Sequence, residues 1–313
     1  MPDDLRHCSL RTLEVFACVA DAGSISAAAR RLHLTQPTVS QQMKRLSERA
    51  GQMLLESHKG RLQPTAFGKA LLRLERDLAH RYRLLDEEMS ALQRGARGRF
   101  TLALINTAQR LIPDLLAGFR QRYPEIDVAV TLGNRAEMLQ RLERRECDLY
   151  IFSHPPARDD VRAAAFLSNP LVVIAPADHP IHQQARAQFT DLLEDTFWLR
   201  ESGSATRSLL ESWLQARAIQ LRRPGIMASN EAIVAAVAAG MGVSVVSRHV
   251  LSAAEQTLVV KLDDWQLSSH WQFIRHNDRP LPLVARHFLQ DVDHHLHHPL
   301  RERTASLEEF ASN

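Results

Sequence analysis

The stretch "LTQPTVSQQMKRL" (residues 34–46) has the features of a helix with one buried and one exposed face. Thr35 can cap this helix, and Pro37 falls in its first turn, where a missing N–H costs nothing. Apolar residues recur at spacings of four and three and form one stripe, made of Val39, Met43 and Leu46. The exposed faces instead carry hydroxyls, amides and cations, at Gln36, Thr38, Ser40, Gln41, Lys44 and Arg45.

Two further helices are predicted immediately before this stretch. Residues 10–22 have inward-facing apolar positions and end at Gly23, and "SISAAARRL" (24–32) follows with Ser26 as its expected cap. The small alanines of the second helix permit close packing against the third. Two short helices joined by about four residues, the second with a polar exposed face, are typical of a helix-turn-helix.

The exposed face of residues 36–45 is suited to the major groove of DNA, because Gln pairs with adenine edges and Thr or Ser bonds bases or phosphates. Residues 26–65 carry seven Lys and Arg against two Glu, whereas the whole chain nets only +3. The alternative is a surface helix of a helical bundle that contacts nothing. The local excess of positive charge favours DNA.

The next segment, "LLESHKGRLQPT" (54–65), predicts a hairpin with a basic tip at Lys59-Gly60-Arg61, the wing of a winged helix. A solvated hairpin without contacts is the alternative. From Thr65 a long helix is expected, with apolar residues at spacings close to a heptad repeat: Phe67, Leu71, Leu74, Leu78, Tyr82, Leu85, Met89 and Leu92. We interpret it as a dimerisation helix, the alternative being a helix packed within its own chain. "QRGARGR" (93–99) is expected to be a flexible linker.

Strands and helices alternate from residue 100 to residue 296, which predicts a parallel sheet built from βα units. Two such series, with one strand returning late at residues 268–276, indicate two lobes joined by crossing strands. A cleft is expected between them at the carboxyl ends of the strands. Helix N-termini bind anions, and several are expected to lie at this cleft.

Composition limits the class of protein. The 313 residues suffice for two or three domains, and 45% hydrophobic with 24% charged residues is ordinary for a globular protein. Three distant cysteines suit a reducing cytosol, and no signal peptide or membrane-spanning run is found. We therefore expect a cytoplasmic protein with no membrane association. An enzyme lacks support because no GxSxG, HExxH or P-loop stands at a strand–helix junction, and a solute-binding protein would not need residues 1–66.

The chain resembles the LysR-type transcriptional regulators over roughly residues 10–297. The resemblance is carried by "GSISAAARRLHLTQPTVSQQMKRL", "GRLQPTAFG", "LIPDLLAGFRQRYPEIDV" and "CDLYI". It implies an α/β multidomain fold: an N-terminal winged helix-turn-helix, a long linker helix and a C-terminal two-lobed effector-binding domain of periplasmic-binding-protein type. It also implies a homodimer or homotetramer on double-stranded promoter DNA, with a small-molecule co-inducer. "LGNRAEMLQRL", "FLSNPLVVIAPADHP", "WLRESGSATR" and "SNEAIVAAVAAGMGVSVVSRH" are similar to Calvin-cycle regulators that activate RuBisCO operons.

The expected domain boundaries follow. They are a DNA-binding domain at 1–66, the linker helix at 67–94, an effector-binding domain at 97–300 and a polar, disordered tail at 301–313. Within the effector-binding domain, lobe I is expected at 97–167 and 274–298, and lobe II at 168–273.

Site residues are carried onto this sequence by the resemblance and by the expected helix ends. DNA-binding residues, reading bases or contacting phosphates, are Ser26, Arg31, Gln36, Pro37, Thr38, Ser40, Gln41, Lys44, Arg45, Lys59, Arg61 and Thr65. Effector-binding residues are Asn106, Thr107, Asn134, Arg135, Ser153, His154, Ser202, Gly203, Ser204, Thr206, Arg207, Asn230, Glu231 and Arg248. Each of the second set could equally be an ordinary helix cap. Arg200 is expected to face the sheet.

The short hydroxyls and arginines at the cleft suit a carboxylate or phosphate, so the expected effector is a small anionic metabolite such as a sugar phosphate or NADPH. A dinucleotide would not bind in Rossmann fashion, because no GxGxxG follows a strand. No catalytic residue, metal site or resident cofactor is expected, and the histidines at 294, 295, 297 and 298 are interpreted as a solvated helix end. The alternative function is a LysR-type regulator of an unrelated operon with a different carboxylate or other co-inducer.

Overall fold

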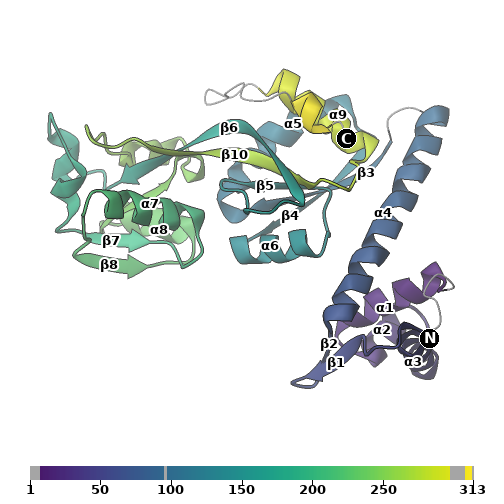
Figure 1. Ribbon diagram of the computed structural model, residues 1–313. Coiled ribbons are helices and arrows are strands. Elements are labelled where there is room, and N and C mark those ends of the chain that lie inside the picture. The colour runs from purple at the N-terminus through teal and green to yellow at the C-terminus, as the bar shows by residue number, and fades with distance from the viewer. Residues whose placement is uncertain (1–7, 95–96, 297–306, 312–313) are drawn as a thin grey trace. The chain divides into compact units, whose positions relative to one another are not determined.

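The computed structural model describes residues 8–94, 97–296 and 307–311. The chain divides into two compact units, which are Met1–Met89 with Glu143–Glu146, and Ser90–Leu142 with Cys147–Asn313 (Figure 1). Each unit has its own hydrophobic core.

The first unit is a winged helix-turn-helix that continues into a long helix. Its elements are α1 (Leu10–Ala22), α2 (Ile25–Arg31), α3 (Gln36–Ala50), β1 (Leu55–His58), β2 (Arg61–Pro64) and α4 (Ala66–Arg94). The predicted order of elements in this unit is therefore confirmed. Its core is formed by one face of each helix, with Phe16, Val19, Ala28, Val39 and Leu46 buried.

The ends of α3 are set by the residues that the sequence analysis singled out. The Thr35 side chain accepts a hydrogen bond from the Thr38 amide over 3.3 Å, and Pro37 lies in the first turn. Gly51 ends the helix in the left-handed conformation with φ +62°. The cap of α2 was misassigned: Ser24 accepts from the Ala27 amide, whereas Ser26 lies inside the helix.

The wing is a two-stranded antiparallel hairpin whose tip is Lys59-Gly60. Both tip residues have positive φ (+48° and +78°), as a two-residue hairpin turn of type I′ requires. The helix that follows packs tightly under this hairpin at Gly68, where a Cβ would lie 2.1 Å from the Leu54 carbonyl oxygen. A glycine at this position is therefore needed for the wing to meet α4.

The apolar seam of α4 divides between two environments. Leu71 is only 6% exposed and packs in the core of the first unit, so the alternative of a helix packed within its own chain holds for that turn. Phe67, Leu74, Tyr82, Leu85 and Met89 are instead exposed large apolar residues. The Leu92 side chain lies outside the described residues. The expected linker is also shorter than predicted, because 93–94 belong to α4 and 98–99 to the next strand.

The second unit alternates strands and helices. Its first elements are β3 (Gly98–Ile105), η2 (Asn106–Leu111), α5 (Ile112–Arg122), β4 (Ile126–Gly133), α6 (Arg135–Glu143), β5 (Leu149–Phe152) and β6 (Val161–Ile174). Next come η3 (Pro180–Gln183), η4 (Phe189–Leu192), β7 (Thr196–Leu199), α7 (Ala205–Ala216), β8 (Arg223–Ile226), α8 (Asn230–Ala238) and β9 (Val243–Ser247). The last are η5 (Arg248–Val250), η6 (Ala254–Leu258), β10 (Leu267–His276), α9 (Leu283–His295) and α10 (Leu307–Ala311).

One eight-stranded sheet joins two lobes, in the order β4-β3-β5-β10-β6-β9-β7-β8. Lobe I contains the parallel strands β4, β3 and β5, and lobe II contains the parallel strands β9, β7 and β8. The long antiparallel strands β6 and β10 run between the lobes (Figure 1). The predicted fold of two βα lobes with crossing strands is confirmed.

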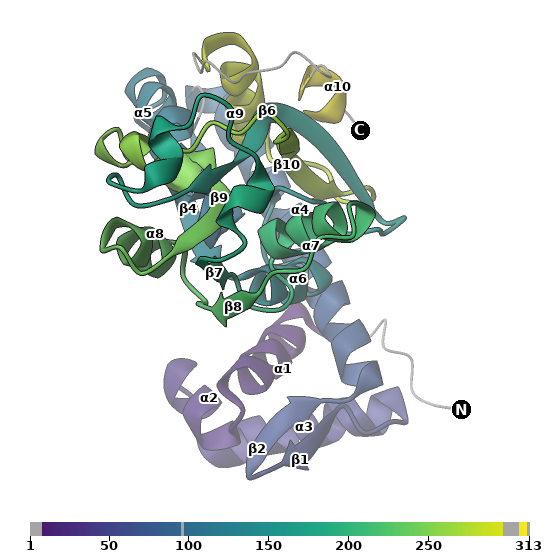
Figure 2. The same ribbon diagram turned by 90° about the vertical axis from the view of Figure 1, so that its left-hand side faces the viewer.

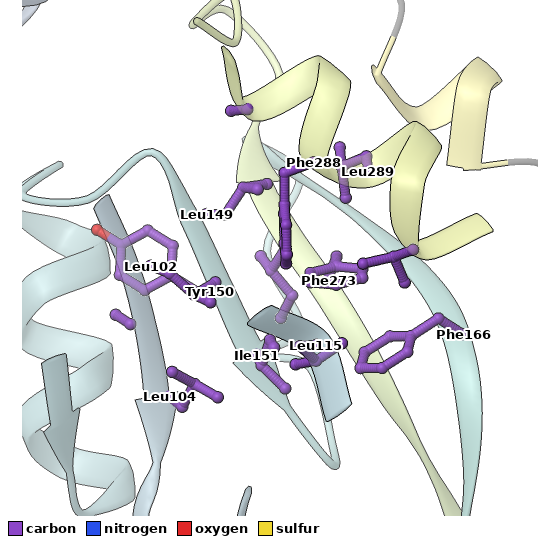
Figure 3. Close-up of a cluster of buried hydrophobic side chains, with 14 of the residues drawn as sticks. Leu102, Leu104, Leu115, Leu149, Tyr150, Ile151, Phe166, Phe273, Phe288 and Leu289 are labelled. Carbon is purple, nitrogen blue, oxygen red and sulfur yellow. The ribbon is translucent and has the colours of Figure 1, made fainter. Parts of the chain in front are cut away.

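Aromatic and branched side chains fill the core of lobe I (Figure 3). The Phe166 and Phe273 rings, from the two crossing strands, stack with centroids 4.3 Å apart. Phe288 of α9 meets Phe100 of β3 at 5.1 Å, so this helix closes one side of the sheet. Burial of such rings supplies most of the stabilisation of a core of this kind.

Three parts of this unit differ from expectation. The crossing strand β6 runs from Val161 to Ile174, through the expected lobe boundary at 167/168, and a 3₁₀ turn at Asn106–Leu111 that was not expected precedes α5. Part of the expected disordered tail is ordered: α10 packs against α9 and β6, with Leu307, Phe310 and Ala311 buried (Figure 2). Residues 301–306 and 312–313 lie outside the described residues.

Candidate DNA-binding surface and effector pocket

The exposed face of α3 carries the residues predicted to read bases. Gln36, Pro37, Ser40 and Gln41 are exposed, whereas Thr38 is half-buried. The Thr38 hydroxyl lies 2.7 Å from that of Thr35, so it is partly used by the helix cap.

Ser26 connects the two helices of the motif. Its hydroxyl donates to Gln36 Oε1 over 3.1 Å. The bond fixes the plane of the Gln36 amide and leaves its Nε2 free to donate to adenine N7, while the second lone pair of Oε1 stays available to accept from adenine N6. Ser26 was predicted as a phosphate contact, and its position indicates that it also positions Gln36.

Most of the predicted phosphate contacts are exposed cations, at Arg31, Lys44, Arg45, Lys59 and Arg61. The Leu62 amide donates to the Gly23 carbonyl over 2.9 Å, which ties the wing to the turn before α2. Thr65 differs from the others, because its hydroxyl donates to the Met53 carbonyl and accepts from the Gly68 amide. The structure thus gives Thr65 a capping role at the start of α4.

The second unit contains a small polar pocket of about 20 Å³ between its two lobes, room for about one water molecule. Its lining residues are Ile105, Asn106, Thr107, Asn134, Arg135, Ser153, Arg200, Glu201, Ser204, Ala205 and Thr206. Seven of the fourteen predicted effector residues are brought together here: Asn106, Thr107, Asn134, Arg135, Ser153, Ser204 and Thr206.

The topology explains this convergence. Strands β3, β4 and β5 of lobe I end at Ile105, Gly133 and Phe152, and the lining residues follow directly. Parallel strands place their carboxyl ends at one edge of a sheet, where ligands bind in open α/β folds. Ser204 begins α7 as its N-cap, and its hydroxyl makes no capping bond, so the first turn of that helix offers free N–H groups.

Arg135 supplies a cation from lobe I. Its Nη1 donates to the His154 carbonyl over 2.6 Å, and its guanidinium lies 5.5 Å from the centroid of the Phe152 ring. Burial lowers the pKa of Arg135 below its usual value. A cation that has lost water in this way gains free energy from an anionic partner.

Arg200 supplies a second cation from lobe II, and the expectation that it faces the sheet is wrong. It lines the pocket and is buried, with only 6% of its surface exposed. Its Nε and Nη2 donate to the two carboxylate oxygens of Glu201 over 2.8 and 2.9 Å, and its Nη1 donates to Asn230 Oδ1 over 2.5 Å. Arg200 and Glu201 were not among the predicted effector residues, although they directly follow strand β7 as the other lining residues follow theirs.

Seven predicted effector residues lie outside the pocket lining: His154, Ser202, Gly203, Arg207, Asn230, Glu231 and Arg248. Asn230 is 2% exposed and lies behind the pocket, where its Nδ2 donates to Thr107 Oγ1 over 3.1 Å. Ser229, rather than Asn230, caps α8, and the Glu231 carboxylate accepts from Ser229 and Gln109.

Two of the predicted arginines have other partners. Arg207 pairs with Glu211 over 2.7 Å and donates to the Arg200 carbonyl. Arg248 lies in a separate groove of about 520 Å³ beside Lys261 and Trp265. Neither Arg207 nor Arg248 lines the pocket, so neither guanidinium group is available there to bind an effector.

Across the described ranges, no group of three or more His, Cys, Asp or Glu could hold a metal ion. His294 and His295 lie near the end of α9, and the histidines at 297 and 298 fall outside those ranges. A search of the described helices finds none long and apolar enough to span a membrane.

A winged helix-turn-helix, a long helix and a two-lobed α/β domain with a polar interlobe pocket define a two-domain bacterial transcription regulator. Residues 10–69 match the family described as "Bacterial regulatory helix-turn-helix protein, lysR family", and residues 93–296 match the "LysR substrate binding domain". The chain belongs to the LysR family of DNA-binding transcription regulators.

Three known proteins show the similarity in detail. The HTH-type transcriptional activator CmpR of Synechocystis sp. is 35% identical over 91% of this chain and 95% of its own. The RuBisCO operon transcriptional regulator of Allochromatium vinosum is 36% identical over 91% of this chain and 96% of its own. The solved regulatory domain of Synechocystis CcmR in complex with 2-PG is 35% identical, with a TM-score of 0.58 over 63% of this chain and 96% of that domain.

Proposed function

We propose that this LysR-type regulator activates a carbon-fixation (RuBisCO) operon and that a small metabolite with two negative charges controls its binding to promoter DNA. The operon is supported by the name of the Allochromatium vinosum relative, and activation by the name of CmpR; both relatives match nearly the whole chain. The effector class is supported by the related regulatory domain solved with 2-PG. The alternative is a LysR-type regulator of an unrelated operon that binds a different carboxylate.

One observation supports an anionic effector most strongly. Two arginines line the same pocket from different lobes, Arg135 from α6 and Arg200 from the segment after β7. Two guanidinium groups with hydroxyls and helix N–H groups between them suit a phosphate at one end and a carboxylate or second phosphate at the other. The pocket as it stands has room for about one water molecule, so we expect its lining side chains to move when the ligand enters.

The same proposal covers assembly and location. The exposed apolar residues of α4 support a homodimer through this helix, and a homotetramer on the promoter. The exposed cations of α3 and the wing support contact with double-stranded DNA in the cytoplasm. No resident cofactor is part of the proposal.

The effector proposal is tested by titration calorimetry of the full-length protein. The probes are 2-phosphoglycolate, 2-phosphoglycerate, phosphoenolpyruvate, ribulose 1,5-bisphosphate and NADPH, with benzoate as a monocarboxylate. We expect at least one dianion to bind and Arg135→Ala to weaken its binding at least tenfold. Arg248→Ala, which removes a guanidinium outside the pocket, is the matched control and should bind as the unmodified chain does. Equal loss in both variants, or no binding of any probe, would contradict the proposal.

A further inference from the structure

We propose that Glu201 is a built-in counter-ion of the effector pocket: its carboxylate occupies Arg200 when no effector is bound, and the effector anion displaces it. This inference rests on the proposed function, because it assumes that an anion enters the pocket. It adds a specific residue that sets both the affinity and the charge selectivity of the site.

The Glu201 carboxylate contacts Arg200 in the way that a bound carboxylate ligand would. Glu201 offers both carboxylate oxygens to Nε and Nη2 of Arg200, over 2.8 and 2.9 Å. This two-pronged arrangement is the one in which guanidinium groups bind carboxylate or phosphate ligands. Glu201 and Arg200 both line the pocket, so an effector that bonds the Nε side of Arg200 must take the place of Glu201.

The main chain holds Glu201 close to Arg200. Strand β7 ends at Leu199, and the Ser204 amide donates to the Glu201 carbonyl over 3.2 Å, which closes a turn over residues 201–204. Gly203, the third residue of this turn, has φ +88°, as a type II turn requires. In a strand, adjacent side chains point to opposite faces of the sheet. Because the strand ends at Leu199 and the turn begins at Glu201, the side chains of Arg200 and Glu201 can instead approach each other.

The two partners differ in their freedom to move. The Arg200 side chain is only 6% exposed and also bonds Asn230, whereas the Glu201 side chain is 30% exposed. A buried guanidinium requires an anionic partner, since an unpaired buried charge is costly. Glu201 can turn toward water at little cost. The exchange therefore keeps Arg200 paired throughout while Glu201 leaves and the ligand arrives.

This exchange selects ligands by charge. With Glu201 in place, the pocket lining holds two guanidinium groups and one carboxylate, and after Glu201 leaves two cations face the ligand. A neutral sugar cannot replace the carboxylate, and a monoanion can satisfy only one arginine. A compact dianion satisfies both, so the pair favours dianions over monoanions of similar size.

Glu201→Gln tests the proposal, because it keeps the size of the side chain and removes its charge. We expect the variant of the full-length protein to bind 2-phosphoglycolate about tenfold more tightly and to discriminate less against inorganic phosphate and acetate. Glu211→Gln is the matched control, since Glu211 pairs with Arg207 on the same helix and lies outside the pocket lining. Its affinities should be unchanged.

The outcomes separate the two hypotheses. If Glu201→Gln binds 2-phosphoglycolate no more tightly than the unmodified chain, Glu201 is only a structural brace and the proposal is overturned. If neither protein binds any probe, the proposed function fails instead. The unmodified protein gives a check independent of the variant's folding: with ligand bound, a crystal structure in which Glu201 Oε2 still lies within about 3.2 Å of Arg200 Nε also overturns it.

Discussion

Asn230 donates from Nδ2 to Thr107 Oγ1 over 3.1 Å, so a buried amide of lobe II is bonded to a hydroxyl of lobe I. The same amide accepts from Arg200 Nη1 over 2.5 Å. A pocket residue of lobe I is thereby linked to the guanidinium of lobe II through one side chain. We interpret this link as one of the contacts that hold the lobes together, beside the bond from Gln109 to Glu231 and the ion pair of Arg110 with Glu255.

Substitution at Thr107 should test this link. Thr107→Val removes the hydroxyl and leaves the buried Asn230 amide without this acceptor, at a cost of about 1–3 kcal/mol in the free energy of unfolding. Because Thr107 also lines the pocket, the substitution removes a hydroxyl that can bond the ligand, and we expect weaker binding of 2-phosphoglycolate. Thr107→Ser keeps the hydroxyl and should retain most of both properties. Urea unfolding and calorimetry measure the two effects, and equal behaviour of the two variants would show that the bond contributes nothing.

The DNA-binding face should separate base reading from phosphate contact. Gln41→Ala is expected to weaken binding to the chain's own promoter by about 1–3 kcal/mol while leaving binding to unrelated DNA nearly unchanged. Lys59→Ala should weaken both equally and reduce the slope of log K against log salt by about 1. Fluorescence anisotropy on the two DNAs across a salt series measures this. Identical profiles for the two variants would contradict the assignment of roles.

The exposed seam of α4 should control assembly. Tyr82 and Leu85 are each about half exposed on this helix. A charge introduced by Leu85→Glu should shift the protein from dimer or tetramer to monomer, because an unpaired carboxylate would be buried in the interface. Lys69→Glu places the same charge at an exposed position on the opposite side of the same helix and serves as control. Analytical ultracentrifugation reports the mass, and an unchanged mass for Leu85→Glu would exclude this seam.

The C-terminal helix should stabilise lobe I. Phe310 is 6% exposed, and its carbonyl accepts from Nε of the buried Arg275 over 2.8 Å. Phe310→Ala should lower the free energy of unfolding by about 2–4 kcal/mol through lost burial. Glu309→Ala, at an exposed position of the same helix, should change it by less than about 0.5 kcal/mol. A loss at Phe310 no larger than at Glu309 would mean that α10 is not docked in solution.

Local signals in the sequence were sufficient for the DNA-binding unit. Thr35, Pro37 and the stripe of Val39, Met43 and Leu46 determine one helix, because caps and periodicity act within a few residues. The same rules failed at α2, where Ser24 and Ser26 are both good caps and only the packing of the helix decides between them. Leu71 was assigned to the dimerisation seam for a related reason, since periodicity does not show which neighbour covers an apolar face.

The effector pocket was only partly predictable. Residues that follow strands at one edge of the sheet were found, because topology alone places them together. The roles of Arg200, Glu201 and Asn230 depend on side-chain pairing and depth, which the order of residues does not encode. In α10, the buried residues Leu307, Phe310 and Ala311 have helical spacing, and the polar composition of the surrounding segment concealed it.

The central claim is that a small dianion alters how this regulator binds its promoter. The most direct measurement is DNase I footprinting of the full-length protein on its own upstream intergenic DNA, with and without 2-phosphoglycolate. The account predicts a long protected site whose length or bending changes with the ligand and does not change in Arg135→Ala. Protection that stays the same with 2-phosphoglycolate and with every other dianion named above would contradict it.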